Sequence, residues 1–268
     1  MRAILLAAGQ GLRLQYPPDR QLPKCLLRIG GISLLERHRR LLTMAGVEEI
    51  VLAVGFRRDL IDAELDRLDW RPQLVMNERY DRGSMLTLHT VAEAMTRGGD
   101  VLLMDADVLY HDRMMALLVE GPQSVNRLLV DRKFEEGEEP VKVCVRGGKP
   151  IELRKRLDPG LQYDTIGESV GFFRLDEPAA HRLAQLVAGH VENSGADLPH
   201  EEALRDLVQE GSHLFEVMDV TGVPWIEIDF AADVLRAEHE VLARLQVPNR
   251  YGAPLRLPGT RARRARGE

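Results

Sequence analysis

The 268-residue sequence has only two cysteines, and aromatic residues make up only 5% of it. Cys25 and Cys144 lie far apart and form no CxxC pair, which argues against a thiolate zinc site or a disulfide framework and favours a reducing cytoplasm. The eight histidines show no HExxH or other paired spacing, so each is expected at the surface or in the core. The opening run MRAILLAAG is too short for a membrane span, and no cleavage site of a signal peptide follows it. We therefore expect a cytoplasmic protein without stable membrane insertion.

An excess of positive charge is also lacking. The formal net charge is -6, built from many charges of both signs, so no basic surface field for nucleic acid is expected and the partners should be small molecules. Only residues 246–268 are rich in arginine without apolar periodicity, which predicts a flexible, solvated tail. Contact of this tail with an anionic membrane or nucleic acid is the less favoured alternative.

The first part of the chain alternates between strand and helix patterns. Apolar runs predict strands at 2–7, 50–54, 73–77 and 101–107. Helical spacing of apolar residues predicts helices at 34–45, 57–68 and 84–97. This order predicts an α/β fold with a Rossmann-like, doubly wound sheet, in which ligands gather at the carboxyl ends of the strands.

After about residue 125 the pattern changes. Strand-like runs at 124–130, 141–145, 150–155 and 168–175 are separated by Gly, Pro and a charged turn, which predicts a small antiparallel extension of a mixed sheet. Helices follow at 178–192, 199–210 and 231–245. We expect a single domain over residues 1–245, with a nucleotide-binding half at about 1–110 and an acceptor-binding half at about 111–245.

The segment 5–27, LLAAGQGLRLQYPPDRQLPKCLL, carries the strongest chemical signal. Small residues directly after a strand let backbone N–H groups approach a nucleotide closely. Arg13 and Lys24 supply positive charge for phosphates and are the candidate catalytic residues. The spacing fits neither a Walker A loop nor the three-glycine dinucleotide fingerprint, which argues against kinases and dehydrogenases. The candidate nucleotide-binding residues of this loop are Leu6, Ala7, Ala8, Gly9 and Gly11.

This segment resembles the signature of the sugar-nucleotide pyrophosphorylases, a nucleotidyltransferase superfamily. NERYDRGSMLTL at 77–88, LLMDADVL at 102–109 and WIEID at 225–229 are most similar to the phosphocholine cytidylyltransferases of the LicC type. Related enzymes act on inositol 1-phosphate or 2-aminoethylphosphonate. The resemblance covers motifs from residue 3 to about 235, and it implies the nucleotide-diphospho-sugar transferase type of fold.

Carboxylates mark a candidate metal site. Asp105 and Asp107 end an apolar strand, and strand alternation points both to the same side. Such hard oxygen ligands suit Mg²⁺, so Asp107 is the first candidate ligand, while Asp105 is assigned to the nucleotide site. In the resembled family an acidic pair from a distant segment completes the metal site, which implies Glu227 and Asp229 here. The alternative for Asp107 is a turn or a helix cap, because a helix begins nearby.

Further polar residues are candidates for substrate contacts. Asn77, Tyr80 and Ser84 lead into a helix, where their side chains and the free N–H groups of the helix start are expected to contact the nucleotide. A packed tyrosine and a capping serine are the alternatives, and the resembled enzymes tend to have Asn near this serine. Glu168 and Glu202 are candidates for acceptor binding, with plain solvent exposure as the alternative.

The expected activity is that of a Mg²⁺-dependent cytidylyltransferase. It would transfer CMP from CTP to phosphocholine, 2-aminoethylphosphonate or inositol 1-phosphate and release pyrophosphate. A hexose 1-phosphate uridylyl- or thymidylyltransferase is the alternative within the same class, and a regulatory nucleotide-binding module without catalysis is the alternative from another class. The acceptor and the oligomeric state, monomer or homodimer, stay open at this point.

Overall fold

The computed structural model describes residues 1–17, 20–47, 49–121, 125–193 and 195–245. The predicted tail at 246–268 lies outside these residues. Within the described part of the chain, none of the helices combines the length and the apolar character that a membrane crossing needs.

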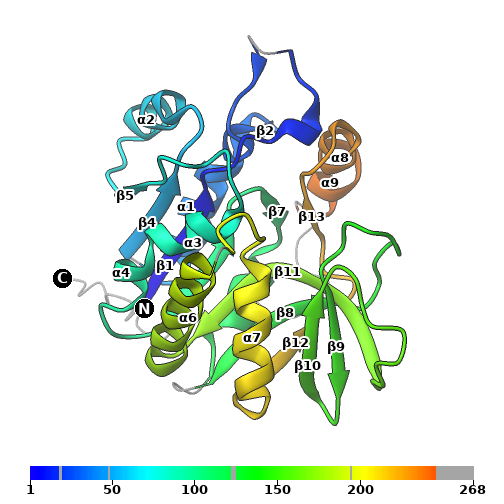
Figure 1. Ribbon diagram of the computed structural model, residues 1–268. Helices are drawn as coiled ribbons and strands as arrows, with labels where there is room; N and C mark the ends of the chain where they lie inside the picture. The colour runs from blue at the N-terminus through cyan, green and yellow to red at the C-terminus, as the bar shows by residue number, and fades with distance from the viewer. Residues whose placement is uncertain (18–19, 48, 122–124, 194, 246–268) are drawn as a thin grey trace, which may run out of the picture.

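Parallel strands form the N-terminal part of the main sheet (Figure 1). They run side by side in the order β6-β1-β4-β5, and each pair of neighbours is parallel. The predicted Rossmann-like sheet is therefore confirmed. The strands are β1 (Arg2–Ala7), β4 (Glu49–Val54), β5 (Gln73–Met76) and β6 (Val101–Asp105).

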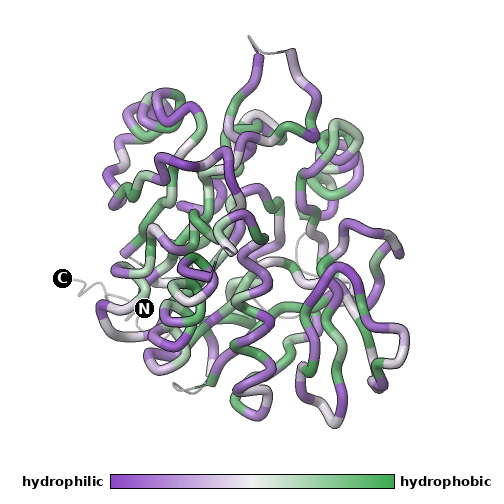
Figure 2. Tube along the Cα trace, in the orientation of Figure 1, coloured by the Kyte–Doolittle hydropathy of each residue, from purple (hydrophilic) through white to green (hydrophobic). Residues whose placement is uncertain are grey.

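Helices cover both faces of this sheet because its strands are apolar on both sides. Along β1, Ile4 belongs to one buried cluster, whereas Ala3 and Leu5 belong to the cluster on the opposite face. The cluster of Ala3 is covered by α1 (Leu34–Met44), α2 (Arg58–Arg67) and α5 (Asp112–Val119). The cluster of Ile4 is covered by α3 (Ser84–Thr90), α4 (Ala92–Met95), α6 (Glu177–Glu192) and α7 (Glu201–Gly211). Figure 2 shows the resulting concentration of apolar residues along the central strands.

The predicted antiparallel extension is not a separate layer but continues the main sheet. Its long strand β11 (Thr165–Leu175) pairs with β6 through residues 172–175 and with β9 (Lys142–Arg146) through residues 165–168. The register of β11 against β8 (Asn126–Asp131) shifts between Ser169 and Phe173, which bends the sheet. β10 (Lys149–Arg154) and β12 (Phe215–Asp219) complete the nine strands that this sheet has among the described residues.

Short elements connect distant parts of the sequence. β7 (Val108–Tyr110) pairs antiparallel with β13 (Trp225–Glu227), which brings the segment 225–229 to the end of β6. β2 (Arg28–Ile29) and β3 (Ile32–Ser33) form a small hairpin. The remaining elements are 3-10 turns at Leu12–Leu14, Lys24–Leu26 and Ser212–Leu214, α8 (Ala231–Arg236), a π-helical turn at Ala237–Val241 and α9 (Leu242–Leu245).

Two predicted helices are interrupted. The helix expected at 84–97 divides into α3 and α4 at Val91, which has a φ of -94° and a ψ of 7°. Thr90 and Val91 are two consecutive β-branched residues, and such residues lose side-chain freedom in a helix. The helix expected at 231–245 contains the π-helical turn in its middle.

A buried ion pair anchors the sheet at the end opposite to the candidate site. The Arg174 side chain on β11 is 2% exposed, and its Nη2 lies 2.6 Å from Oδ2 of Asp100. We expect Arg174→Met to lower the free energy of unfolding by about 3–5 kcal/mol, because it leaves the Asp100 carboxylate without its buried partner. Urea denaturation followed by circular dichroism measures this change.

The matched control is Arg182→Met. The side chains of Arg182 and its partner Glu210 are both almost half exposed, so the change should stay within about 1 kcal/mol. Equal losses in the two variants would contradict the structural role of the buried pair.

Candidate active site

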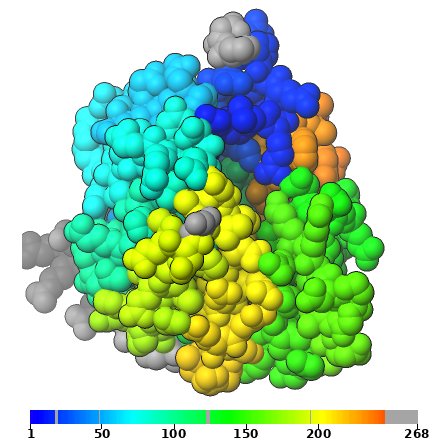
Figure 3. Space-filling model, viewed as in Figure 1, coloured from blue at the N-terminus to red at the C-terminus, as the bar shows by residue number. Residues whose placement is uncertain are grey.

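A pocket of about 400 Å³ opens at the carboxyl ends of β1 and β6. The surface is hollowed there, between the N-terminal residues and the residues near 200 (Figure 3). Most of the residues singled out from the sequence line this pocket: Leu6, Ala7, Ala8, Gly9, Gly11, Arg13, Lys24, Tyr80, Ser84, Asp105, Asp107 and Glu227.

The glycines after β1 keep the pocket open. A Cβ atom on Gly9 would meet nothing within 4 Å, so this backbone borders open space. Gly11 has a φ of 63°, and a Cβ atom there would lie 3.0 Å from Cγ of Lys24. Only glycine combines that left-handed conformation with such a close side chain. Gly11 therefore gives Lys24 its path into the pocket.

Lys24 lies between two carboxylates from distant segments. Its Nζ is 2.8 Å from Oδ2 of Asp107 and 2.7 Å from Oδ1 of Asp229. Burial on its own would lower the pKa of Lys24, but the two aspartates outweigh it and the pKa is raised. The ammonium group stays charged and is the cation that lets the two acids lie close together.

Asp107, Glu227 and Asp229 form a group that could hold a metal ion. One oxygen of each lies within 4.8 Å of the others, and all three residues are half-buried. Burial and the neighbouring Asp107 and Asp229 raise the pKa of Glu227 well above its ordinary value, because a third ionised carboxylate is unfavourable there. Three carboxylates that reach one point offer the hard oxygen ligands that a divalent cation binds.

Arg13 lies beside this group. Its Nη2 is 2.7 Å from Oδ1 of Asp229, its Nη1 is paired with Glu139, and its guanidinium lies over the ring of Phe230 at 5.6 Å. Glu139 also binds Lys155 at 3.1 Å. The sequence analysis did not single out Glu139, because a charged turn carries no signal that distinguishes one of its acids from the next.

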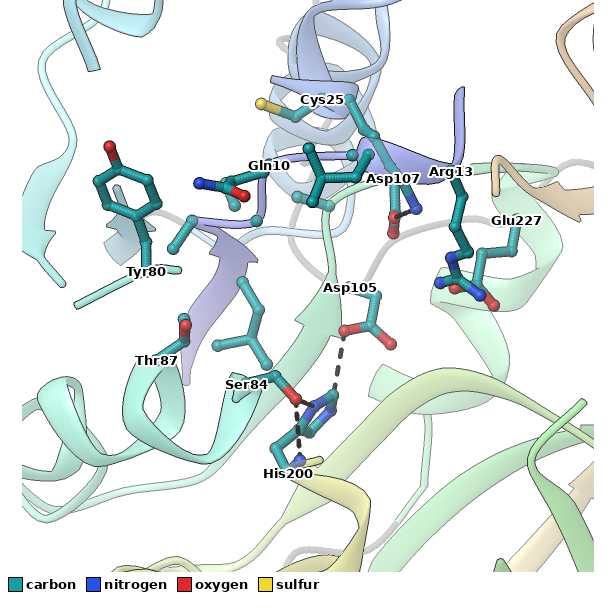
Figure 4. A pocket seen from close by; sticks show the side chains of 18 of the residues that line it. Gln10, Arg13, Cys25, Tyr80, Ser84, Thr87, Asp105, Asp107, His200 and Glu227 are labelled. Atoms are coloured by element: carbon teal, nitrogen blue, oxygen red, sulfur yellow. Dashed lines mark hydrogen bonds and ion pairs between the residues drawn. The ribbon is translucent and has the colours of Figure 1, made fainter. Parts of the chain in front are cut away.

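Asp105 lies between the two ends of the pocket (Figure 4). A Cβ atom on Gly171 would lie 2.1 Å from Oδ2 of Asp105, and Gly171 has a φ of 77°. The shifted register of β11 at this glycine thus makes room for the carboxylate. Burial, together with Asp107 and Glu201, raises the pKa of Asp105 well above its ordinary value.

The start of α3 differs from the expectation of free N–H groups. The N–H of Met85 donates to the carbonyl of Leu198 at 3.1 Å, so this group is not available to an anion. Oγ of Ser84 accepts the N–H of His200 at 2.9 Å and lies 3.1 Å from Nδ1 of the same residue. The turn before α7 packs here because Gly83 has no side chain, since a Cβ atom there would lie 2.3 Å from the backbone of Asp197.

The turn before α7 also contributes residues that the sequence analysis missed. His200 and Glu201 line the pocket, and Nε2 of His200 lies 3.8 Å from Oδ1 of Asp105. Glu202, the residue expected to bind the acceptor, is instead paired with Arg154 at 3.0 Å. Its neighbour Glu201 takes the place in the pocket. The pattern HEEAL does not reveal which glutamate faces inward until the start of the helix is known.

Asp229 and two other predicted residues, Asn77 and Glu168, lie near the pocket without lining it. Asn77 is 2% exposed, and its amide binds Thr87, which does line the pocket. Glu168 lies on β11 opposite Asp131. Burial, with Asp131 and Asp229 nearby, raises the pKa of Glu168 to about 7.

Comparisons with known proteins agree with this geometry. Residues 3–161 match the model of the MobA-like NTP transferase domain. A bifunctional IPC transferase and DIPP synthase of Rubrobacter xylanophilus is 28% identical over 252 residues, which cover 90% of this chain and 52% of the relative. The chain spans about half the length of this relative and of others with the same name.

Solved structures show the same fold. The inositol-1-phosphate CTP transferase from T. maritima has a TM-score of 0.69 at 23% identity, with 90% of this chain and 97% of that one covered. The CTP:phosphocholine cytidylyltransferase LicC from Streptococcus pneumoniae has a TM-score of 0.68 at 21% identity, with 88% and 97% covered. The family match, the relatives and this shared fold together confirm the resemblance inferred from the motifs. Since the family match spans more than half of the residues, including the glycine loop and Asp107, this chain belongs to the MobA-like NTP transferase family.

Proposed function

We propose that the protein is a Mg²⁺-dependent cytidylyltransferase that transfers CMP from CTP to a small phosphate- or phosphonate-bearing alcohol. The observation that carries this proposal is the position of Lys24 between Asp107 and Asp229, with Glu227 and Arg13 beside them. Two cations and three acids at the end of a glycine-lined pocket suit a triphosphate with a divalent ion. Both structural neighbours named above act with CTP by their names, which favours CTP here.

The reaction needs no covalent enzyme intermediate. An oxygen of the acceptor phosphate attacks the α-phosphorus of CTP, a new P–O bond forms, and the bond to the β-phosphate breaks to release pyrophosphate. The acceptor oxygen is anionic near neutral pH, so alignment and charge neutralisation are the main contributions required.

The residues divide this work. Asp107, Glu227 and Asp229 would hold the Mg²⁺, which supplies positive charge against the phosphate oxygens. With these acids engaged by a metal ion, Lys24 and Arg13 would lose part of their pairing with Asp229 and could bind phosphate oxygens. Lys24 then acts as a point charge, while the fork of Arg13 can bind two oxygens. Cys25 lines the pocket but takes no part as a nucleophile, because burial raises the pKa of its thiol to about 12.

A substrate panel tests the reaction. We expect pyrophosphate release with CTP and at least one of phosphocholine, 2-aminoethylphosphonate and inositol 1-phosphate, and loss of release when the metal ion is chelated. A coupled pyrophosphate assay measures it, with UTP, dTTP and GTP and with glucose 1-phosphate as comparisons. Release with UTP or dTTP and glucose 1-phosphate alone would instead favour the sugar nucleotidyltransferase. No release from any pair, although CTP binds, would favour a regulatory module.

Removal of one metal-site acid tests the assignment of the carboxylates. Asp229→Asn keeps the shape of the side chain but removes the charge that Lys24, Arg13 and the metal ion share. We expect kcat to fall about 100-fold or more, because that charge is aligned with the phosphates. The control Asp66→Asn removes an exposed aspartate and should leave kcat unchanged. A kcat for Asp229→Asn close to that of the wild type would contradict the metal site.

The dependence of the free energy of unfolding on pH tests the environment of the Glu168 carboxyl, and its response to acceptor tests the assignment of Glu168 to the acceptor end. The folded protein raises the pKa of Glu168 from 4.5 to about 7, so between these values the unfolded chain loses this proton more readily and stability falls as pH rises. Glu168→Gln removes this loss. We expect the variant to be more stable than the wild type near pH 8 and equal to it near pH 4.5 in urea denaturation.

The control for removing one negative charge is the exposed Glu136→Gln. A gain in stability for Glu168→Gln that is the same at both pH values would show that burial does not raise the pKa of the Glu168 carboxyl. A gain that appears only at high pH and is lost when the acceptor substrate binds would place this carboxylate next to the acceptor.

A further inference from the structure

Thr87 lies at the end of the pocket away from the metal-site acids. In Figure 4 Thr87 lies below Tyr80, whereas Arg13 and Glu227 lie on the opposite side of the pocket. The side chains of Tyr80 and Thr87 are uncharged. A nucleotide that places its triphosphate against Arg13 and Lys24 would extend its base toward this end, which Asp81 and Arg82 also line.

The hydrogen bond between Asn77 and Thr87 has a fixed direction. The backbone N–H of Arg79 donates to Oδ1 of Asn77 at 2.9 Å, so this side of the amide must be the oxygen. Nδ2 of Asn77 then faces Thr87 and donates to its Oγ1 at 3.0 Å. Because a backbone N–H can only donate, the N–H of Arg79 sets the direction of both hydrogen bonds.

The hydroxyl proton of Thr87 is left for a ligand. Thr87 is 7% exposed, and its oxygen already accepts from Asn77. Among the residues that the structure describes, no side chain or carbonyl accepts the proton of this hydroxyl. A buried donor without an acceptor is costly, and the pocket is the remaining direction in which it can find one.

We propose that Thr87, oriented by Asn77, donates a hydrogen bond to N3 of the nucleotide base and thereby selects cytosine over uracil. In cytosine N3 is an acceptor for the Thr87 proton. In uracil N3 carries a proton, which Thr87 could accept only with its second lone pair, and its own proton would then be left without an acceptor. The edge with N3 lies away from the sugar, and so it is the edge that reaches the far end of a pocket whose other end holds the phosphates. The inference rests on the proposed function and names the residue pair that gives its preference for CTP.

Thr87→Val removes the donor and keeps the shape of the side chain. We expect kcat/KM for CTP to fall about 10-fold to 100-fold, because N3 is then buried without a donor. The value for UTP should change less than about threefold, since uracil made no such bond. The ratio of the two values is the readout, because a general loss of stability would lower both alike.

Thr90→Val is the matched control on the same helix. The hydroxyl of Thr90 donates to the carbonyl of Thr87 at 2.8 Å and does not reach the pocket. The ratio of CTP to UTP activity should match that of the wild type. If Thr87→Val also keeps the wild-type ratio, the proposal is wrong.

Asn77→Asp provides a second test that changes polarity instead of removing the hydroxyl. At a pH high enough to ionise it, the new carboxylate can still accept from the N–H of Arg79 but cannot donate, so Thr87 must donate to it and present its oxygen to the pocket. We expect a shift of preference toward UTP, whose N3 proton then finds an acceptor. A ratio that moves toward CTP would overturn the assignment.

The dissociation constants of CTP and UTP, measured by calorimetry without acceptor, separate this inference from the proposed function. A wild type that binds CTP more tightly than UTP, with this preference lost in Thr87→Val, supports the role of Thr87 even if no acceptor is turned over. Turnover of CTP by the wild type with an unchanged binding preference in both variants upholds the proposed function and rejects the role of Thr87.

Discussion

The ion pairs of Lys24 with Asp107 and Asp229 are the interaction on which the rest of the site depends. Two half-buried carboxylates whose oxygens lie within 4.8 Å of each other repel unless a cation lies between them. Lys24 lies 83 residues from one of its partners and 205 residues from the other. The same ammonium group therefore neutralises the acids and connects three distant segments of the chain.

Apolar packing holds these segments in place. Ile226 and Ile228 belong to a buried cluster with Leu14, Leu27 and the π-helical turn. In a strand, successive residues face opposite sides, so burying the isoleucines turns Glu227 and Asp229 toward Lys24. The pairing of β13 with β7 sets the position of this strand relative to Asp107. The charges of the site are thus positioned by hydrophobic burial on the other face of the same short strand.

The parts of the site that follow local periodicity could be predicted from the sequence. The end of an apolar strand marked Asp105 and Asp107, and the glycines marked the loop before Arg13. The alternation of strands and helices likewise predicted the doubly wound sheet, although not the order of its strands. These features depend on neighbours within a few residues, which is the range over which strand and helix periods carry information.

Other parts depend on tertiary contacts and could not be read in this way. Glu139 meets Arg13 only because the turn before β9 folds back over the glycine loop. Which of Glu201 and Glu202 faces the pocket depends on the residue at which α7 begins, next to the start of α3. Asn77 was expected to contact the nucleotide itself, whereas the structure buries it behind Thr87.

Different interactions determine the properties of the two ends of the pocket. At the phosphate end, charges from several segments act on one another across a half-buried space, so a change in any one of them alters the balance of all the others. At the proposed base end, two groups set the direction of the hydrogen bond that Thr87 accepts. One is the backbone N–H of Arg79, which always donates, and the other is the side chain of Asn77, which a substitution can change. A change at position 77 therefore reverses what the hydroxyl of Thr87 presents without touching the acids or Lys24. The proposed base preference and the proposed phosphate chemistry accordingly depend on different residues.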